Sequence, residues 1–254
     1  MEANVYILEC LSNLHMGSGD VNYSVIDLEV QRDAVSGEPT MNASGVKGAI
    51  RDFCVKSGMK EDDIVRIFGG KDKDKKDVQG SCQFFSGDLL ARPVRVSEGV
   101  DSYALATTRE LIEDFLNKLS AFGYRDLFGE NDSPDLKDKV ICGRPNTFVE
   151  GEQAEKGESK LLSAILGTDK WALMNPQQLQ AIDLPTQAHN VLENGQSKNL
   201  WYEEYVPHKS IFGLLVVSPD AVLDAAINNR VIQFGAGFST GNGFMKLTKY
   251  LKEV

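Results

Sequence analysis

Four side chains that could transfer protons lie in two short stretches of this 254-residue chain. His15 and Asp27 belong to HMGSGDVNYSVIDLEVQRD, which starts at residue 15 and is too polar for ordinary core. Glu203 and Tyr205 belong to LWYEEYVP and, being two residues apart, would share one face of a strand. Such groups can act as general acids and bases. Each also has an ordinary interpretation: a hydrogen-bonded turn histidine, a strand-end aspartate, or a strand of an amphipathic hairpin.

Two further stretches offer backbone that can approach a phosphate closely. Residues 235–243, GAGFSTGNG, lack the closing Gly-Lys-Ser/Thr of a P-loop and the third glycine of a dinucleotide fingerprint. Their composition alone slightly favours a long hairpin turn. SGVKGAIR places Ser44 and Lys47 at a predicted helix N-terminus, which favours anions. Lys47 and Arg51 lie on one helix face, although a capped helix with two surface cations explains the same pattern.

Composition restricts the class of protein. A hydrophobic content of 42% and a charged content of 25% are ordinary for a globular domain. A net charge of −10 argues against a generally basic surface, so any nucleic-acid site must be local. We expect a cytoplasmic protein without membrane contact, because no apolar run reaches 18 residues and Glu2 stands where a signal peptide would be basic. The cysteines form no CxxC pair, which favours small buried residues: Cys10, Cys54, Cys82 and Cys142.

Alternating strands and helices must position these groups. Residues 5–11 read as an opening strand, and a helix is expected to begin at Asn42 or Ser44. A second long helix is expected to begin at Thr107 or Thr108. The strand between these two helices contains Pro93, which favours a position at a sheet edge.

The second half of the chain contains a hairpin signal. AHNVL and LWYEEYV bracket ENGQSKN, so we expect a β-hairpin with Asn194-Gly195 at its tip. The run SIFGLLVV predicts a buried strand, and the helix after it is expected to have Ser218 as its cap and Pro219 in its first turn. His189, His208, Trp171 and Trp201 receive no catalytic role, and the two tryptophans are expected to be packing residues.

The order of elements predicts an α+β fold of ferredoxin or RRM-like type. Residues 1–143 and 200–254 would form its main body, or palm. Residues 144–199 would form an insertion that carries the hairpin and projects from the main body.

Four stretches occur in an order that resembles one family. They are HMGSG…VIDLEVQRD…GEP…ASGVKGAIR, FFSGDLLARPVRVSEGVDSYALATTRELI, LWYEEYVP and GAGFSTGNGF. Together they resemble the RAMP superfamily, and within it the backbone subunits of type III-B CRISPR (Cmr) RNA-targeting complexes. The resemblance covers most of the chain and implies a modified RRM-like palm with an inserted thumb hairpin.

The resemblance also implies roles for individual residues. Asp27 matches the catalytic aspartate of the family and would bind the metal, and His15 matches the histidine before its glycine turn. Glu203 and Tyr205 match an acidic and aromatic pair at the cleavage site, and Lys47 matches a lysine that holds the guide backbone. The RNA-binding residues implied in this way are Ser18, Ser44, Lys47, Arg51, Gly235, Gly237, Ser239, Thr240, Gly241 and Gly243.

The function implied is cleavage of target RNA within a filament. Copies of the subunit would stack along a guide RNA with other Cmr subunits, and each thumb would splay a target nucleotide at regular intervals. The complementary target would be cut beside each splayed position with Mg²⁺ or another divalent metal. Two alternatives remain open: a non-cleaving guide-RNA scaffold of the same superfamily, and a small-molecule enzyme that holds a phosphate in the glycine loop.

Overall fold

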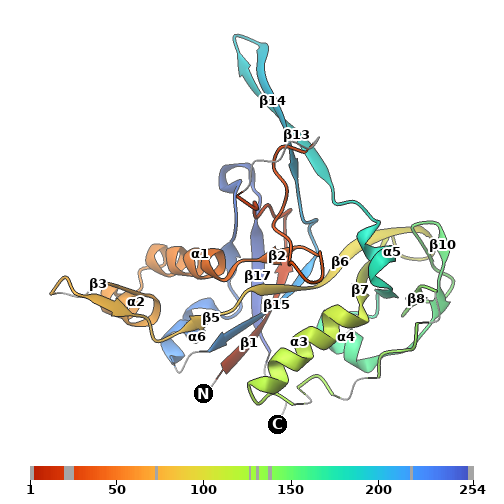
Figure 1. The fold of residues 1–254 in the computed structure, drawn as a ribbon, viewed down its shortest axis with the longest axis horizontal. Coiled ribbons are helices and arrows are strands. Elements are labelled where there is room, and N and C mark those ends of the chain that lie inside the picture. Colours follow the sequence, from red (N-terminus) through yellow and green to blue (C-terminus); the bar gives the residue numbers. More distant parts are fainter. Residues whose placement is uncertain are drawn as a thin grey trace.

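A large mixed sheet of 13 strands forms the centre of the molecule, and a two-stranded hairpin projects from it (Figure 1). The computed structural model describes residues 3–19, 26–71, 74–125, 127–129, 132–136, 139–217 and 220–250. The main path of the sheet has the order β11-β8-β12-β7-β6-β15-β1-β17-β16. This confirms a mixed α/β fold with one large sheet, whereas the finer ferredoxin or RRM-like assignment stays a prediction.

The opening strand β1 (Ala3–Cys10) lies between β15 (Ile211–Val217) and β17 (Phe244–Lys249) and is antiparallel to both. Every residue of β15 is buried, as the sequence predicted. Helices cover both faces of the sheet at this point, so alternate residues of β15 enter different clusters. Phe212 packs in one hydrophobic cluster and Leu215 in the other.

The first cluster lies under α1 (Ala43–Lys56), α2 (Glu61–Phe68) and α6 (Ala221–Ile227). The second lies under α3 (Arg109–Ala121) and α4 (Lys160–Leu166). Figure 1 shows these two helix groups on opposite sides of the central strands.

Glycine 213 explains why the second cluster can pack closely on β15. A Cβ atom at Gly213 would lie 2.4 Å from the ring of Phe115, which belongs to α3 and is fully buried. The absence of a side chain therefore lets the phenyl ring of Phe115 rest against the strand.

The strand β6 (Gly87–Glu98) is an interior strand, so its predicted edge position is wrong. It pairs with β15 on one side and with β7 (Tyr103–Thr108) on the other. Pro93 is tolerated because β15 pairs with residues 88–91 only, and Pro93 lies beyond them, opposite Leu105 of β7.

The structure also tests the predicted helix starts. Helix α3 begins after Thr108, whose side chain accepts a hydrogen bond from the Leu111 amide, which confirms that cap. Helix α1 begins after Asn42. The cap of α6 is Asp220, and the predicted Ser218 and Pro219 lie outside the described residues.

The region between residues 144 and 199 does not project as a whole. Strand β12 (Trp171–Met174) lies inside the large sheet, parallel to β7, and its four residues are buried. Projection is confined to β13 (Thr186–Glu193) and β14 (Gln196–Glu204), which form a separate two-stranded sheet. The domain boundaries stay a prediction.

The hairpin turn is Asn194-Gly195, as predicted, and both residues have positive φ. The remaining elements complete the description. They are β2 (Thr40–Met41), β3 (Gly69–Lys71), β4 (Asp77–Gln79), β5 (Gln83–Phe84), β8 (Ile141–Cys142), β9 (Phe148–Val149), β10 (Glu152–Gln153), β11 (Glu155–Lys156), α5 (Pro176–Gln180), β16 (Val231–Gln233) and the 3-10 turn η1 (Phe238–Thr240).

All four cysteines are buried and unbridged, as the sequence predicted. Among the helices of the described residues, none is both long and apolar enough to cross a membrane.

Candidate functional site

His15 lies in the segment that follows β1, and its side chain is buried. The segment is paired with the chain beyond β14, because Leu14 and Val206 exchange both backbone hydrogen bonds at 2.8 Å. The Nδ1 atom of His15 lies 2.7 Å from the carbonyl oxygen of Glu204. A carbonyl oxygen can only accept, so Nδ1 carries a proton, and Nε2 keeps a lone pair in the neutral ring.

A glycine keeps the space beside Nε2 open. A Cβ atom at Gly17 would lie 3.2 Å from Nε2 of His15. The glycine turn after the histidine therefore leaves room for a small group at the atom that can exchange a proton.

Asp27 is exposed and lies against β14 at Tyr202. Its Oδ2 atom accepts a hydrogen bond of 2.8 Å from the Tyr202 amide, and its own amide donates to the Tyr202 carbonyl oxygen at 3.1 Å. The next residue, Leu28, pairs with Glu203 in a parallel bridge. Asp27 is thus placed one residue before Glu203 along the strand, with its carboxylate facing solvent.

Glu203 and Tyr205 lie together, as their spacing predicted. The Tyr205 hydroxyl donates to Oε2 of Glu203 at 2.6 Å, and the indole of Trp201 donates to Oε1 at 2.7 Å. Partial burial alone would raise the pKa of the Glu203 carboxyl. These two hydrogen bonds, followed by the charge interactions with His189 and His15, outweigh burial and hold the pKa below its usual value. Burial, followed by the bond to Glu203, raises the pKa of the Tyr205 hydroxyl.

His189 completes this group, although no catalytic role was expected for it. Its Nε2 atom lies 3.0 Å from the Tyr205 hydroxyl and 3.5 Å from Oε2 of Glu203. Its ring stacks on Trp201 with a centroid distance of 5.4 Å and an interplanar angle of 19°. We refer to Glu203, Tyr205, His189 and Trp201 as the thumb-base cluster.

The neighbouring Glu204 has its carboxylate in a different set of contacts. It is buried, accepts the Val30 amide at 3.0 Å through Oε2, and pairs with Arg32 at 2.5 Å through Oε1. These contacts hold residues 28–32 against β14, directly after Asp27. Glu203 thus belongs to the thumb-base cluster, whereas Glu204 holds the segment that follows Asp27 against β14.

The glycine loop lies beside the His15 segment. The Ala236 amide donates to the His15 carbonyl oxygen at 2.9 Å, and a Cβ atom at Gly235 would lie only 2.2 Å from that oxygen. The loop contains η1, flanked by Gly237 and Gly241 in the left-handed conformation. Ser239 and Thr240 are both exposed there, and the predicted strand–loop–strand arrangement is confirmed by the pairing of β16 with β17.

The start of α1 lies on the same side of the molecule as this segment. A Cβ atom at Gly45 would lie 2.9 Å from Cε of Met16, the residue that follows His15. Ser44 and Arg51 are exposed, and Lys47 is half-buried. Ser18 donates its amide to the Glu29 carbonyl oxygen at 3.2 Å. The start of α1 and the glycine loop, the two predicted phosphate-binding stretches, thus both lie against the His15 segment, although their binding roles stay predictions.

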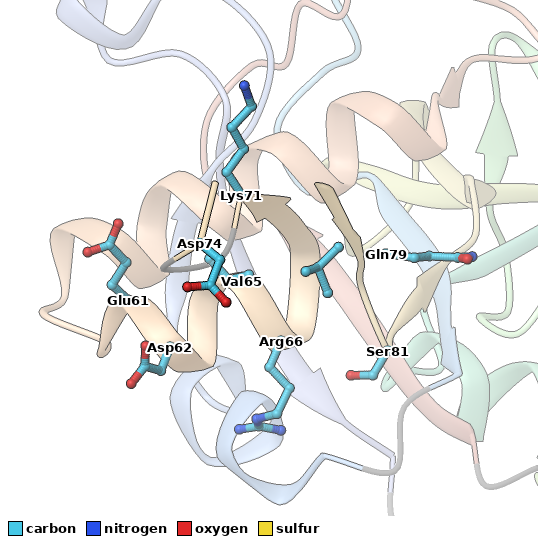
Figure 2. A pocket seen from close by; sticks show the side chains of 9 residues that line it. Glu61, Asp62, Val65, Arg66, Lys71, Asp74, Gln79 and Ser81 are labelled. Carbon is cyan, nitrogen blue, oxygen red and sulfur yellow. The ribbon is translucent and has the colours of Figure 1, made fainter. Parts of the chain in front are cut away.

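A separate pocket lies at α2 and the β3–β4 hairpin (Figure 2). Its volume is about 590 Å³, and carboxylates and cations line it together. Arg66 is already paired with Asp63 and with Asp220. The lining residues include none of the predicted site residues: Glu61, Asp62, Val65, Arg66, Lys71, Asp74, Val78, Gln79 and Ser81.

The described residues contain no group of three or more His, Cys, Asp or Glu side chains placed to hold a metal. Asp27 offers one exposed carboxylate with one oxygen bonded to an amide. Mg²⁺ is commonly held by one or two carboxylates together with water and substrate phosphates. The site therefore fits a metal shared with a phosphate-bearing substrate, and it does not fit a cage made by the protein alone.

A protein-family model matches the chain from residue 7 to residue 246, and its description is the RAMP superfamily. The chain belongs to the RAMP superfamily. This match spans the His15 segment, the thumb-base cluster and the glycine loop of the RAMP chain, and it confirms the family-level resemblance.

Two curated proteins are similar to this RAMP chain. The CRISPR system Cmr endoribonuclease Cmr4 of Pyrococcus furiosus is 26% identical, over 100% of this chain and 97% of that protein. The CRISPR system CMR subunit Cmr4 of Saccharolobus solfataricus is 25% identical, over 89% of this chain and 70% of that protein.

Solved structures share the fold. A chain of the type III-B Cmr-beta complex bound to cognate target RNA superimposes with a TM-score of 0.78 at 22% identity, covering 98% of each chain. The crystal structure of oligomeric Cmr4 from Pyrococcus furiosus gives a TM-score of 0.73 at 21% identity, covering 100% of this RAMP chain and 99% of that chain.

Proposed function

We propose that this chain is the repeating backbone subunit of a type III-B CRISPR (Cmr) complex and cleaves target RNA paired to a guide RNA. One observation carries the proposal: Asp27 presents an exposed carboxylate at the base of a projecting hairpin, bonded to the amide of Tyr202, which directly precedes Glu203 on β14. The two curated relatives support it, because one is named as a Cmr endoribonuclease and the other as a Cmr subunit.

The projecting hairpin β13–β14 is the proposed thumb, and the large sheet with its helices is the proposed RRM-like palm. This projection beside the site would insert between guide and target and splay one target nucleotide. Paired A-form RNA prevents the 2′-oxygen from aligning with the adjacent phosphorus and leaving 5′-oxygen, so a splayed nucleotide removes that constraint.

The proposed RNA path runs over the glycine loop and the start of α1. Backbone amides without neighbouring side chains can approach phosphates closely, and Lys47 and Arg51 supply positive charge. Further copies of this chain, other Cmr subunits, the guide RNA and the complementary target RNA are the proposed partners. The structures of an oligomeric Cmr4 and of a target-bound complex are consistent with this set.

The reaction proposed is attack of the 2′-oxygen on the adjacent phosphorus, with cleavage of the bond to the 5′-oxygen. Asp27 accepts the 2′-proton or holds a divalent metal such as Mg²⁺, which when bound supplies positive charge for the developing phosphorane. The Nδ1–H of His15 donates a hydrogen bond to the backbone carbonyl oxygen of Glu204, so a proton for the leaving oxygen comes from Nε2 of the imidazolium form. Glu203 acts as a fixed negative charge, because both of its oxygens already accept hydrogen bonds.

The test uses the guide-loaded assembly with end-labelled complementary RNA and Mg²⁺. We expect an evenly spaced ladder of products from the unmodified assembly. With Asp27→Asn we expect at least a hundred-fold slower cleavage with unchanged assembly on the guide, since a catalytic base contributes about 10²–10⁴ in rate. An Asp27→Asn assembly that cuts at the original rate overturns this assignment, and an unmodified assembly that binds target without cutting favours the non-cleaving scaffold.

A further inference from the structure

The thumb-base cluster contains a histidine that contacts two of the four predicted catalytic residues. His189 lies on β13, the strand of the hairpin that carries none of the predicted catalytic residues, directly opposite Trp201 of β14. Its Nε2 atom is within hydrogen-bond distance of the Tyr205 hydroxyl. It therefore joins β13 to the predicted catalytic residues at the end of β14.

The direction of the hydrogen bonds follows from the groups present. Tyr205 donates its single hydroxyl proton to Oε2 of Glu203, at 2.6 Å. The hydroxyl can then only accept from His189, so Nε2 of His189 carries the proton of that bond. The order of donation is His189 to Tyr205 to Glu203.

The position of the His189 ring is fixed from its other side. The rings of His189 and Trp201 stack, and the Trp201 indole donates to Glu203 at 2.7 Å. Tyr205 is buried, and Glu203 is partly buried. Each member of the cluster thus has at least two contacts with the others, and such a network restricts the orientation of its members.

From this arrangement we propose that His189 is a positioning residue for RNA cleavage, which holds Tyr205 and Glu203 in their reactive orientation by donating from Nε2 to the Tyr205 hydroxyl. This inference rests on the proposed endoribonuclease function. The positioning effect comes from the Nε2–H group of His189 and not from the stacking of its ring on Trp201. Loss of the donor leaves the Tyr205 hydroxyl held by Glu203 alone, so its effect falls on the rate of the chemical step.

Two substitutions separate the donor from the ring. His189→Phe keeps a planar ring opposite Trp201 and removes the donor. His189→Gln removes the ring and keeps an amide N–H near the position of Nε2. His208→Ala is the matched control, because His208 is exposed and the contact that involves it is made by its backbone amide.

The experiment measures cleavage in the guide-loaded assembly as a function of target concentration, after confirming that each variant assembles. We expect kcat for His189→Phe to fall about ten-fold with KM unchanged, which corresponds to about 1.4 kcal/mol. We expect His189→Gln to retain most of the rate and His208→Ala to retain all of it.

Every other order of rates overturns the inference. A His189→Phe assembly at the full rate shows that the donor is idle, and a His189→Gln assembly as slow as His189→Phe shows that the hydrogen bond is not what His189 contributes. An effect on KM alone assigns His189 to target binding. Asp27→Asn is assayed beside them: if it does not slow cleavage, the proposed site fails, and if it does while His189→Phe does not, only the present inference fails.

Discussion

Replacement of Glu204 by alanine is expected to destabilise the fold much more than removal of an exposed ion pair of similar length. The buried Glu204 carboxylate accepts the Val30 amide at 3.0 Å and pairs with Arg32 at 2.5 Å. Alanine removes both contacts, and it leaves the amide of Val30, itself a buried residue, without its carboxylate partner.

The expected magnitude follows from these two contacts. An unpaired buried amide costs about 1–3 kcal/mol. Arg32 has 41% of its side chain exposed, so water can solvate its guanidinium after the change, and this contact adds only about 1 kcal/mol. The sum is about 3 kcal/mol, which for a chain of this size lowers Tm by about 6–12 °C.

The assay is thermal and urea unfolding of the purified chain, with Glu193→Ala as the control. Glu193 pairs with Lys198 at 2.8 Å, and both side chains are about 60% exposed, so its loss costs at most about 1 kcal/mol. Equal destabilisation by the two substitutions would refute the reasoning, because it would mean that burial and the amide contact of Glu204 add nothing.

Two further predictions concern single groups. Gly243→Ala is expected to destabilise by about 2 kcal/mol or more in urea unfolding, because Gly243 has φ +81° and a Cβ atom there would lie 1.9 Å from the Phe234 carbonyl oxygen; Gly241→Ala, with the same φ and open space around it, is the control that isolates the close contact. Tyr205→Phe removes a donor to Glu203, so the pKa of that carboxyl is expected to rise, as a carboxyl-selective NMR titration would detect. Because the folded-state pKa of Glu203 is lowered, the stabilisation from this bond is present above the unfolded-state pKa near 4.5. It is lost as pH falls through the folded-state pKa. A difference in Tm between Tyr205→Phe and the parent that stays the same in acid would contradict this prediction.

The sequence predicted local elements well where one strong signal decided them. The Asn194-Gly195 pair fixed the hairpin tip, because both turn positions need positive φ. The apolar run of β15 predicted full burial, and Thr108 was one of the two predicted caps of α3. The edge position expected for β6 was wrong, because how far β15 pairs along β6 depends on tertiary packing and not on Pro93 alone.

The contacts of His189 could not be predicted from the sequence, because the hairpin contains one irregularity in its pairing. Glu193 pairs with Gln196 beside the turn, and a regular ladder from there would place His189 opposite Leu200. A register shift between Val191 and Leu192 instead places it opposite Trp201. Since a slip of one residue exchanges the two faces of a strand, this bulge is what makes the stacked pair possible.

The same contacts that form the candidate site also hold the hairpin on the body of the molecule. An isolated two-stranded hairpin is at best marginally stable, and β13–β14 pairs with no strand of the large sheet. At its base, Glu204 and the amide of Tyr202 fix β14 to the segment of Asp27. His189 in turn joins β13 to Glu203 of β14 through Tyr205. A change in the angle of the hairpin must therefore move the groups proposed to cut RNA. This coupling gives a physical reason why a nucleotide splayed by the hairpin would meet its catalytic groups only when the hairpin is seated.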